Sequence, residues 1–310
     1  MALTVPAPTL PGARASGPGI RHRGDGRAAL GFLAPSGAGF LAFTLIPIVG
    51  SLVIAFFAWP VLGRKKFVGI ENFTELISDP VFHQVMLNTF VFVVAYVPLN
   101  IVVSLGLALW ISSRIRWKGL YRLLFFIPTV TPMVANALVW RLLYQPNGLI
   151  SQTWEAVTGT PAPNFLGDPT WAMAAVVMMS VWQGFGYNML VFSAGLDAIP
   201  QSIQEAATVD GVGPLRRLWS VTLPMLSPSM FFATIMTLIT SFQVFVQPQI
   251  MTAGGPGIAT ETVVIHLYRE GFVQYELGTA SAIAWFLFLI IMLVTALQFV
   301  GQKRWVHYDG

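Results

Sequence analysis

The sequence predicts an all-α membrane protein with six transmembrane helices. Of its 310 residues, 55% are hydrophobic and only 10% are charged, whereas a soluble domain usually carries about 25% charged residues. The apolar segments are long and continuous, which favours helices over the short alternating strands of a membrane barrel. A chain of this composition must satisfy its backbone hydrogen bonds within the lipid, and helices do so.

The first apolar segment follows a stretch rich in proline and arginine, residues 1–28, which we expect to form a disordered cytoplasmic tail. The apolar run after it is too long to be the core of a cleavable signal peptide. We therefore expect residues 29–310 to form one transmembrane domain. Each predicted span reaches the ~20 residues that a bilayer requires, and the spans cover about 29–59, 85–112, 120–144, 171–196, 223–250 and 277–301.

The distribution of lysine and arginine predicts the orientation of these spans. Twelve of the 17 basic residues lie in segments on the same side as both termini, and five lie in the opposite segments. This bias indicates cytoplasmic N- and C-termini, and it places residues 197–222 in a cytoplasmic loop. Because the basic residues mark topology at the surface of the lipid, we do not expect nucleic acid as a partner.

Several kinds of chemistry are excluded by residues that the sequence lacks. It has no cysteine, and its four histidines are scattered, so we predict neither a metal site nor a catalytic residue. It has no P-loop sequence, so it carries no ATPase site of its own. The spans contain almost no ionisable side chain, which argues against a proton-coupled carrier. If the chain moves a solute uphill, the energy must enter from another subunit through a cytoplasmic surface.

The predicted cytoplasmic loop overlaps the charged stretch EAATVDGVGPLRRLWSVTLPMLSP, residues 205–228. Pro200 suits the first position of a helix, and residues 200–209 predict a short helix. Gly211 can adopt the left-handed conformation that ends a helix. Four residues at helical spacing share a face that a partner could approach closely, namely Ile203, Ala206, Ala207 and Asp210.

A second short helix is predicted to begin at Pro214 and to end where Leu223 and Pro224 introduce the fifth span. The loop would then be a helix–turn–helix that projects into the cytoplasm. Two interpretations are open at this point. The arginines could meet lipid headgroups in an ordinary interfacial loop, or the loop could be a rigid projection that docks in a groove of a cytoplasmic motor.

This stretch resembles the signature of the permease subunits of binding-protein-dependent ABC importers. The signature is EAA, three residues and a glycine, then an LP pair, and it is matched by residues 205–207, Gly211 and residues 223–224. The segments FVGIENF, NTFVFVV, GLDAIPQSIQEAA and TAGGPGIATET resemble the carbohydrate-uptake branch, so the resemblance covers nearly all of residues 30–305. Val212, Gly213 and Leu218 depart from the residues that are usual there.

The resemblance implies a type I importer permease fold in a bacterial inner membrane, with no cofactor in this chain. It also implies a second homologous permease subunit, two ATP-binding subunits that hold ATP and Mg, and an extracytoplasmic solute-binding protein. The loop would transmit ATP-driven movement through the coupling residues Glu205, Ala206, Ala207, Asp210 and Gly211. A self-contained secondary carrier is the competing class.

A path for a hydroxyl-rich solute needs amides for hydrogen bonds and aromatic faces for stacking. Polar and aromatic residues in the third, fourth and fifth spans predict such a path, and these are Asn136, Trp140, Gln183, Tyr187, Asn188, Gln243 and Gln247. The alternative is that these side chains form hydrogen bonds between helices.

Two segments bear on the substrate. GPLRR at 213–217 and YREGF at 268–272 resemble the permeases of glycerol-3-phosphate and glycerophosphodiester importers. We therefore rank glycerol-3-phosphate or its diesters first, and neutral sugars or oligosaccharides second. An anionic solute would favour a cation near the path, which Arg141 or Arg269 could supply, although each could equally anchor the chain at the membrane interface.

Overall fold

The computed structural model of the protein describes residues 25–113 and 115–302, and most of them are helical. The predicted tail lies outside these residues except for 25–28. The chain divides into two compact units, Met1–Ser51 and Leu52–Gly310, which are described separately below. Within the described residues, five helices are long and apolar enough to cross a membrane, and a bent pair of helices would provide a sixth span.

The described part of the first unit is one long apolar helix. It consists of α1 (Asp25–Phe40), the π-helical turn η1 (Leu41–Leu45) and the start of α2 (Ile46–Ile54). The π turn ends two residues before Pro47, and the Ile46 amide donates to the Leu41 carbonyl. Proline has no N–H with which to continue the α-helical pattern, so the wider turn carries the helix past this position.

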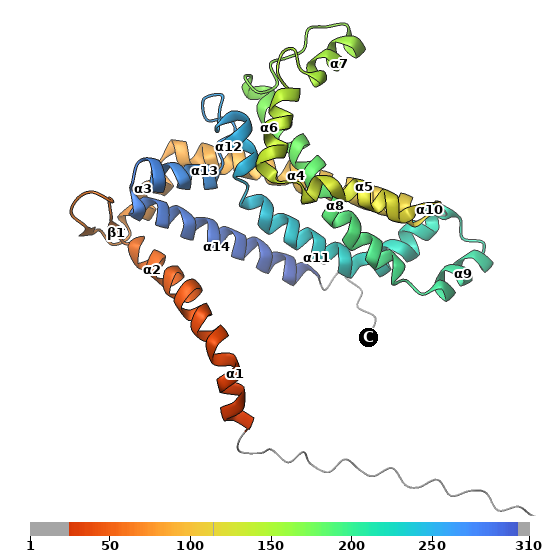
Figure 1. Cartoon of the computed structure of the whole chain (residues 1–310), viewed down its shortest axis with the longest axis horizontal. Helices are drawn as coiled ribbons and strands as arrows, with labels where there is room; N and C mark the ends of the chain where they lie inside the picture. Colours follow the sequence, from red (N-terminus) through yellow and green to blue (C-terminus); the bar gives the residue numbers. More distant parts are fainter. Residues whose placement is uncertain (1–24, 114, 303–310) are drawn as a thin grey trace, which may run out of the picture. The chain divides into compact units, whose positions relative to one another are not determined.

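The long helices of the second unit lie side by side (Figure 1), and they are α4 (Pro80–Ser112), α5 (Lys118–Val130), α8 (Pro169–Asp197), α11 (Leu223–Phe242) and α14 (Leu277–Gly301). The central helix is α8, because 67% of its most apolar stretch is buried, against 28% for α4 and 11% for α14. α14 has the bounds of the predicted sixth span.

The helices α4 and α8 begin in the same way, with an aspartate N-cap followed by a proline. The Asp79 carboxylate accepts hydrogen bonds from the amides of Val81 and Phe82, and Asp168 accepts one from the Thr170 amide. These caps satisfy amides that have no partner within the helix. Both helices therefore begin before the apolar segments from which the second and fourth spans were predicted.

The predicted first span, 29–59, is too long at its end. The helix stops at Ile54, and β1 (Phe57–Ala58) pairs in an antiparallel hairpin with β2 (Lys66–Phe67). The hairpin forms because Pro60 cannot continue a helix and residues 61–65 provide an exposed turn. Next comes α3 (Glu71–Ser78), whose buried Asn72 side chain donates to the carbonyls of Ala55 and Phe57.

The predicted third span, 120–144, is not a single helix. It is broken at residues 131–132 into α5 and α6 (Met133–Leu143), which are bent by 92°. Pro132 has no N–H to donate to the Pro128 carbonyl four residues earlier, and the buried Asn136 side chain donates to that carbonyl instead, at 3.0 Å. The amide of Asn136 therefore satisfies a backbone group that the bend leaves open.

The prediction of a second short helix that ends at Leu223 and Pro224 is wrong. The helix runs without interruption from Pro214 to Phe242, through α10 (Pro214–Arg217), the π turn η2 (Leu218–Thr222) and α11. Within η2, the Leu223 amide donates to the Leu218 carbonyl, so Pro224 is again accommodated by a wider turn. The predicted fifth span, 223–250, instead breaks at residues 243–245, before α12 (Val246–Thr252).

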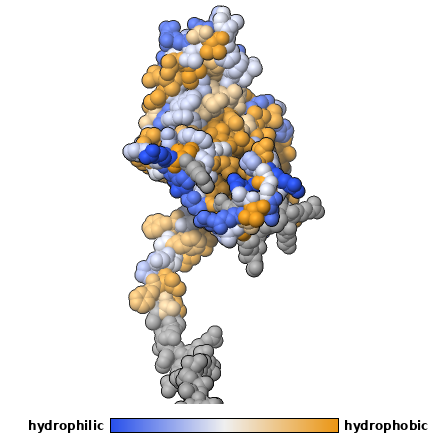
Figure 2. All heavy atoms as spheres, turned by 90° about the vertical axis from the view of Figure 1, so that its right-hand side faces the viewer, coloured by the Kyte–Doolittle hydropathy of each residue, from blue (hydrophilic) through white to orange (hydrophobic). Residues whose placement is uncertain are grey.

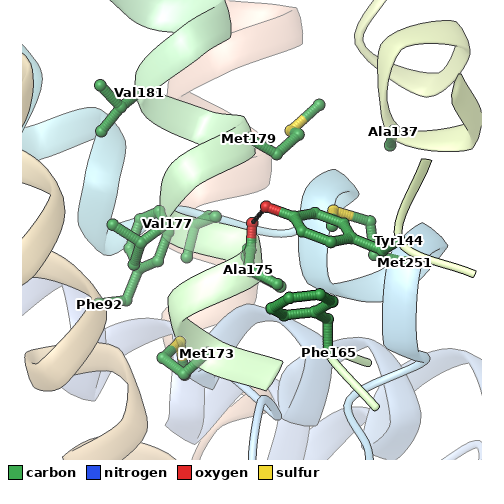
Figure 3. Close-up of a cluster of buried hydrophobic side chains, with 12 residues drawn as sticks. Phe92, Ala137, Tyr144, Phe165, Met173, Ala175, Val177, Met179, Val181 and Met251 are labelled. Carbon is green, nitrogen blue, oxygen red and sulfur yellow. Dashed lines mark hydrogen bonds between the residues drawn. The ribbon is translucent and has the colours of Figure 1, made fainter. Parts of the chain in front are cut away.

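Aromatic and apolar side chains around the N-terminal half of α8 form one part of the core (Figure 3). Val177 and Met173 of α8 lie beside Phe92, and Phe165 lies beside Tyr144. The Tyr144 hydroxyl donates to the Ala175 carbonyl of α8 at 3.4 Å. The shorter elements that complete the unit are α7 (Leu149–Thr158), α9 (Gln201–Val209), α13 (Val263–Tyr268) and the π turn η3 (Arg269–Val273).

The contact between α5 and α8 depends on Gly186. A Cβ atom at this position would lie 2.6 Å from the Phe125 carbonyl oxygen and 2.6 Å from the Thr129 hydroxyl oxygen. The first of these neighbours is backbone and has little freedom to move. Thr129 also donates to the Gln183 carbonyl of α8 at 2.9 Å, so the two helices are held at close range.

Replacing Gly186 with alanine should lower the free energy of unfolding by about 1–3 kcal/mol, because the added methyl group must push the two helices apart. Gly106 provides the matched control, since it lies within α4 and a Cβ there would meet nothing within 4 Å. Gly106→Ala should be neutral or slightly stabilising. Thermal unfolding of the detergent-solubilised chain, followed by circular dichroism, measures both, and equal midpoints would contradict the prediction.

Candidate coupling surface and translocation path

The loop predicted to be cytoplasmic lies at one end of the second unit, where α9 projects beyond the long helices (Figure 1). This end faces the viewer in Figure 2, and hydrophilic atoms gather on it below a more apolar surface. Glu205 is exposed there. Its carboxylate accepts a hydrogen bond of 2.7 Å from the Gln201 amide on the preceding helical turn.

The other four predicted coupling residues do not share one surface. Ala206, Asp210 and Gly211 are exposed, but Ala207 is only 8% exposed and packs inward. Consecutive residues of an α-helix point about 100° apart, so Ala206 and Ala207 cannot both occupy the centre of an outer face. The surface open to a partner is therefore narrower than the one predicted from the sequence.

The turn after α9 is fixed by backbone hydrogen bonds. The Gly211 amide donates to the Thr208 carbonyl at 3.1 Å, and the Val212 amide donates to the Ala207 carbonyl at 3.0 Å. This pair of bonds is the Schellman motif, which requires a left-handed residue between the helix and the next segment. Gly211 has a φ of +70°, so the conformation predicted for it is present.

A hollow of about 1150 Å³ lies between α9 and the ends of the long helices. Its lining includes Ser112 from the end of α4, Asp197 from the end of α8, and Glu205 and Thr208 from α9. Arg217 also lines it, and this side chain donates to the Thr208 hydroxyl at 3.5 Å. The projecting loop is thus joined to the body mainly through its two ends.

Two of the seven predicted path residues, Gln243 and Gln247, line a cavity. This cavity of about 190 Å³ lies beside the helix break at residues 243–245. Phe92 and Tyr96 of α4, Met133 of α6 and Thr240 of α11 also line it. Tyr96 was not among the predicted path residues. A tyrosine four residues before Asn100 in an apolar span could have indicated a polar helix face.

Asn188 belongs to a buried polar cluster that joins three helices. Its amide donates to Asn100 Oδ1 of α4 at 2.7 Å and to the Thr237 hydroxyl of α11 at 2.8 Å. Ser104 of α4 completes the cluster by donating to the Phe185 carbonyl of α8 at 2.9 Å. For Asn188 the interhelical alternative therefore describes the geometry better than a path-lining role.

The remaining predicted path residues are dispersed. Asn136 binds the Pro128 carbonyl, as described above, and Gln183 is buried in α8. Trp140 packs against Tyr144 and Trp182, with ring centroids 5.6 and 5.5 Å apart. Tyr187 is 45% exposed on α8. None of these four residues lines the cavity beside the helix break.

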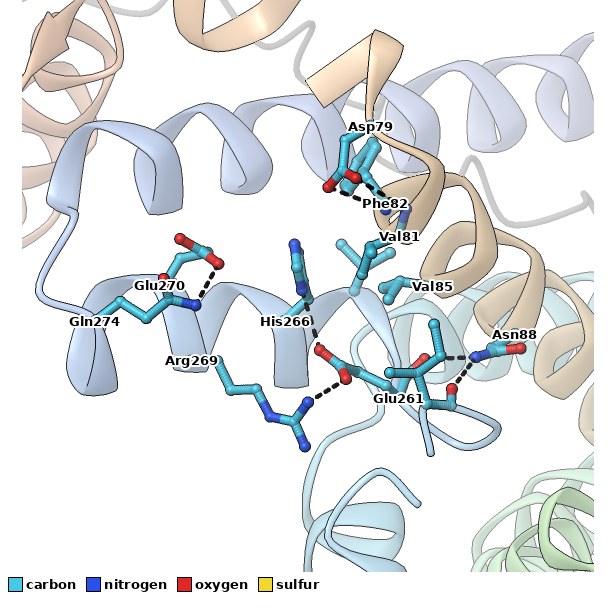
Figure 4. Close-up of polar contacts among 12 residues, drawn as sticks. Asp79, Val81, Phe82, Val85, Asn88, Glu261, His266, Arg269, Glu270 and Gln274 are labelled. Carbon is cyan, nitrogen blue, oxygen red and sulfur yellow. Dashed lines mark hydrogen bonds and ion pairs between the residues drawn. The ribbon is translucent and has the colours of Figure 1, made fainter. Parts of the chain in front are cut away.

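The segment after α12, residues 253–273, contains a buried ion cluster (Figure 4). Glu261 is 1% exposed, and its carboxylate contacts Arg269 Nη1 on one oxygen and His266 Nδ1 on the other, the latter at 3.0 Å. Arg269 Nη2 also donates to the Ala253 carbonyl at 2.8 Å. Burial raises the pKa of the nearby Glu270 carboxyl, an effect that His266 opposes.

Neutral side chains connect this ion cluster to α4 and to the helix break. Asn88 of α4 donates to the carbonyls of Ile258 and Glu261, at 2.6 and 3.1 Å. The Thr262 hydroxyl donates to the Val244 carbonyl at 2.8 Å. Val244 lies within the break and lines the 190 Å³ cavity, so the segment after α12 helps to fix the cavity wall.

The two arginines considered for an anionic solute differ in their contacts. Arg269 is bound to Glu261 and is therefore occupied. Arg141 is exposed at the end of α6, where it donates to the Ile250 carbonyl of α12 at 3.4 Å, and it has no carboxylate partner among the described residues. In the described part of the chain, no three metal-ligating side chains come together.

Long apolar helices around a polar helix break, with a helix and a tight turn projecting from one end, define this chain as a multi-span membrane permease. It belongs to the family described as binding-protein-dependent transport system inner membrane component, whose model matches residues 100–307. The chain is thus a bacterial inner-membrane protein and a permease subunit of an ABC transporter, which is not itself an enzyme.

Two relatives and one solved structure illustrate the similarity. The chain is 34% identical over 283 residues to the sn-glycerol-3-phosphate transport system permease protein UgpA of Pectobacterium atrosepticum, with 83% of this chain and 92% of the relative covered. It is 34% identical over 282 residues to the lactose transport system permease protein LacF of Rhizobium radiobacter, with 88% and 93% covered.

The solved structure is that of a bacterial alginate ABC transporter in complex with an alginate pentasaccharide-bound periplasmic protein. One of its chains superposes on this one with a TM-score of 0.77, covering 90% of this chain and 95% of the other at 18% sequence identity. This likeness establishes the fold, which is the type I importer permease fold expected from the sequence.

Replacing Glu261 with glutamine should lower the free energy of unfolding by about 1.5–3 kcal/mol, because Arg269 loses a charged hydrogen-bond partner. Glu75→Gln is the control, since Glu75 is exposed on α3 and no ion pair of Glu75 is found among the described residues. Arg269→Gln should destabilise the Glu261→Gln variant less than it destabilises the unchanged protein, because the ion pair is already lost. Unfolding midpoints in detergent measure this, and additive effects would contradict the ion pair.

Proposed function

We propose that this chain is the transmembrane subunit of an ATP-driven importer that takes up a carbohydrate-class solute. The observation that carries the proposal is the cavity beside the break at residues 243–245. It combines the amides of Gln243 and Gln247 with the aromatic rings of Phe92 and Tyr96. A hydroxyl-rich solute would bind by hydrogen bonds to the amides and by stacking on the rings.

Glycerol-3-phosphate, or one of its diesters, is our first candidate substrate. The permease UgpA, which is 34% identical to this chain, is named for glycerol-3-phosphate transport. The phosphate of such a solute would need a cation, and of the two arginines considered above Arg141 is the one without a carboxylate partner among the described residues. It lies about two helical turns, or ~12 Å, along α6 from Met133 of the cavity wall.

A neutral sugar or oligosaccharide is the second candidate, and a specific contact favours it. The other outer arginine, Arg269, is bound to Glu261, so the region of the path has fewer free cations than the sequence suggested. The permease LacF, also 34% identical, is named for lactose transport. The two candidates are distinguished by whether uptake depends on Arg141.

The energy for uptake would enter through α9 and the turn at Gly211. We propose that these residues dock on one of two ATP-binding subunits, which hold ATP and Mg, while a second homologous permease completes the membrane core. An extracytoplasmic binding protein would deliver the solute. ATP binding would move the docked loop and open the cavity outward, and hydrolysis would return it inward. A secondary carrier, by contrast, would transport alone in liposomes and would not co-purify with an ATPase.

Gln243→Ala should reduce uptake of either substrate class about two- to twelvefold, because losing one hydrogen bond of a bound solute weakens binding by about 0.5–1.5 kcal/mol. Gln152→Ala is the control, since Gln152 is exposed on α7. If the imported solute is glycerol-3-phosphate, Arg141→Gln should abolish its uptake; if the solute is lactose, Arg141→Gln should leave uptake unchanged. Uptake of each radiolabelled solute by proteoliposomes with the complete importer is the measurement, and full activity of Gln243→Ala would refute the assigned path.

Gly211→Ala should reduce ATP-driven uptake several-fold, because alanine in the left-handed conformation is unfavourable by about 1–2 kcal/mol and the turn would relax. The control is Gly213→Ala, at an exposed position whose φ of −63° suits any residue. Both variants should insert in the membrane equally. Solute-stimulated ATP hydrolysis and uptake should fall together in Gly211→Ala, and unchanged coupling would count against this docking surface.

A further inference from the structure

The hairpin between α2 and α3 carries three consecutive cations, Arg64, Lys65 and Lys66. All three are exposed, and no carboxylate of the described residues forms an ion pair with them. Lys65 instead lies over the Trp59 ring, with Nζ 3.8 Å from its centroid. Only five basic residues are predicted to lie on the side of the membrane opposite to both termini, and these cations are three of them. The positive-inside rule therefore does not explain their presence.

Apolar side chains share the hairpin with these cations. Leu62 is 89% exposed, and Phe67 is 66% exposed. Phe57 contacts both Trp59 and Phe67, with ring centroids 6.0 and 5.3 Å apart. Val61, next to Leu62, is 49% exposed, so three exposed apolar side chains gather on one short hairpin, which is the composition of a surface that has an apolar partner.

The hairpin lies where apolar helices end. Its first strand begins three residues after Ile54, the last residue of α2. It is also tied to the start of α14, since the Leu277 amide donates to the Trp59 carbonyl at 3.0 Å and the Val61 amide donates to the Tyr275 carbonyl at 2.9 Å. The ends of two candidate spans therefore place the tip at the depth of the lipid headgroups, whichever way the chain is oriented.

We propose that this hairpin is a binding site for anionic phospholipid at the membrane surface. Leu62 and Phe67 enter the apolar edge of the bilayer, Trp59 lies at the interface, and the three cations bind the phosphate groups of neighbouring lipids. A membrane surface satisfies the apolar and the cationic residues at the same time. A docked acidic protein would satisfy the charges, but the position at the helix ends favours lipid.

The absence of cysteine allows a single label to be placed in the full-length chain. Leu62→Cys is labelled with a fluorophore, and the protein is reconstituted in phosphatidylcholine vesicles that contain a minor fraction of lipid with brominated acyl chains. That fraction is either phosphatidylglycerol or phosphatidylcholine. Because each cation near an anionic surface contributes a factor of about five in affinity, brominated phosphatidylglycerol should quench this label several-fold more than brominated phosphatidylcholine does.

Two controls separate the headgroup effect from simple lipid contact. A label at Leu293→Cys, which is 60% exposed on α14, should be quenched equally by both lipids. Changing the cations to glutamine, R64Q/K65Q/K66Q, should remove the preference at position 62, whereas R64K should keep it. Equal quenching by both lipids at position 62 would overturn the proposal. So would an unquenched label that becomes shielded when the solute-binding protein is added, since the hairpin would then be a protein interface.

Discussion

The need to satisfy every backbone polar group inside a bilayer is the constraint on which this structure depends. Both breaks in the apolar helices meet it with side chains from elsewhere. Asn136 supplies the donor that Pro132 lacks, and Thr262 supplies a donor to the Val244 carbonyl in the second break. These side-chain donors allow α6 to turn away from α5 and α12 to turn away from α11. The cavity beside Gln243 exists because the second of these breaks is tolerated.

Polar residues in the spans therefore serve two different purposes. The side-chain amides of Asn136 and Asn188 donate hydrogen bonds to backbone or side-chain oxygens of neighbouring helices. These donors are therefore already in use. Gln243 and Gln247 flank the break and line the cavity. Glu261, Arg269 and Asn88 do not touch the cavity but hold the loop that binds its wall. The geometry of the cavity wall thus depends on a charged cluster outside the cavity.

Hydropathy predicted where most of the apolar helices lie, because burial in lipid demands long apolar segments whatever their contacts. The left-handed conformation of Gly211 could also be predicted, since it depends only on the local sequence. Pro132 and Pro224 look alike in the sequence, yet one ends a helix and the other lies within one. The difference lies in the π turn at Leu218–Thr222 and in the tertiary donor Asn136, which single-sequence patterns do not reveal. The pairing of Arg269 with Glu261 likewise could not be predicted from the sequence, because it depends on the three-dimensional path of the loop.

The uninterrupted helix Pro214–Phe242 has a mechanical consequence. Its 29 residues make a rod about 43 Å long, and one end adjoins the turn at Gly211 while the other ends at Gln243. A stiff rod transmits a tilt with little loss along its length. The hollow beneath α9 leaves room at the near end. A small displacement of the projecting loop would therefore reach the cavity wall along one continuous helix, whose hydrogen-bond pattern changes at the π turn and is interrupted at Pro224 and Pro228.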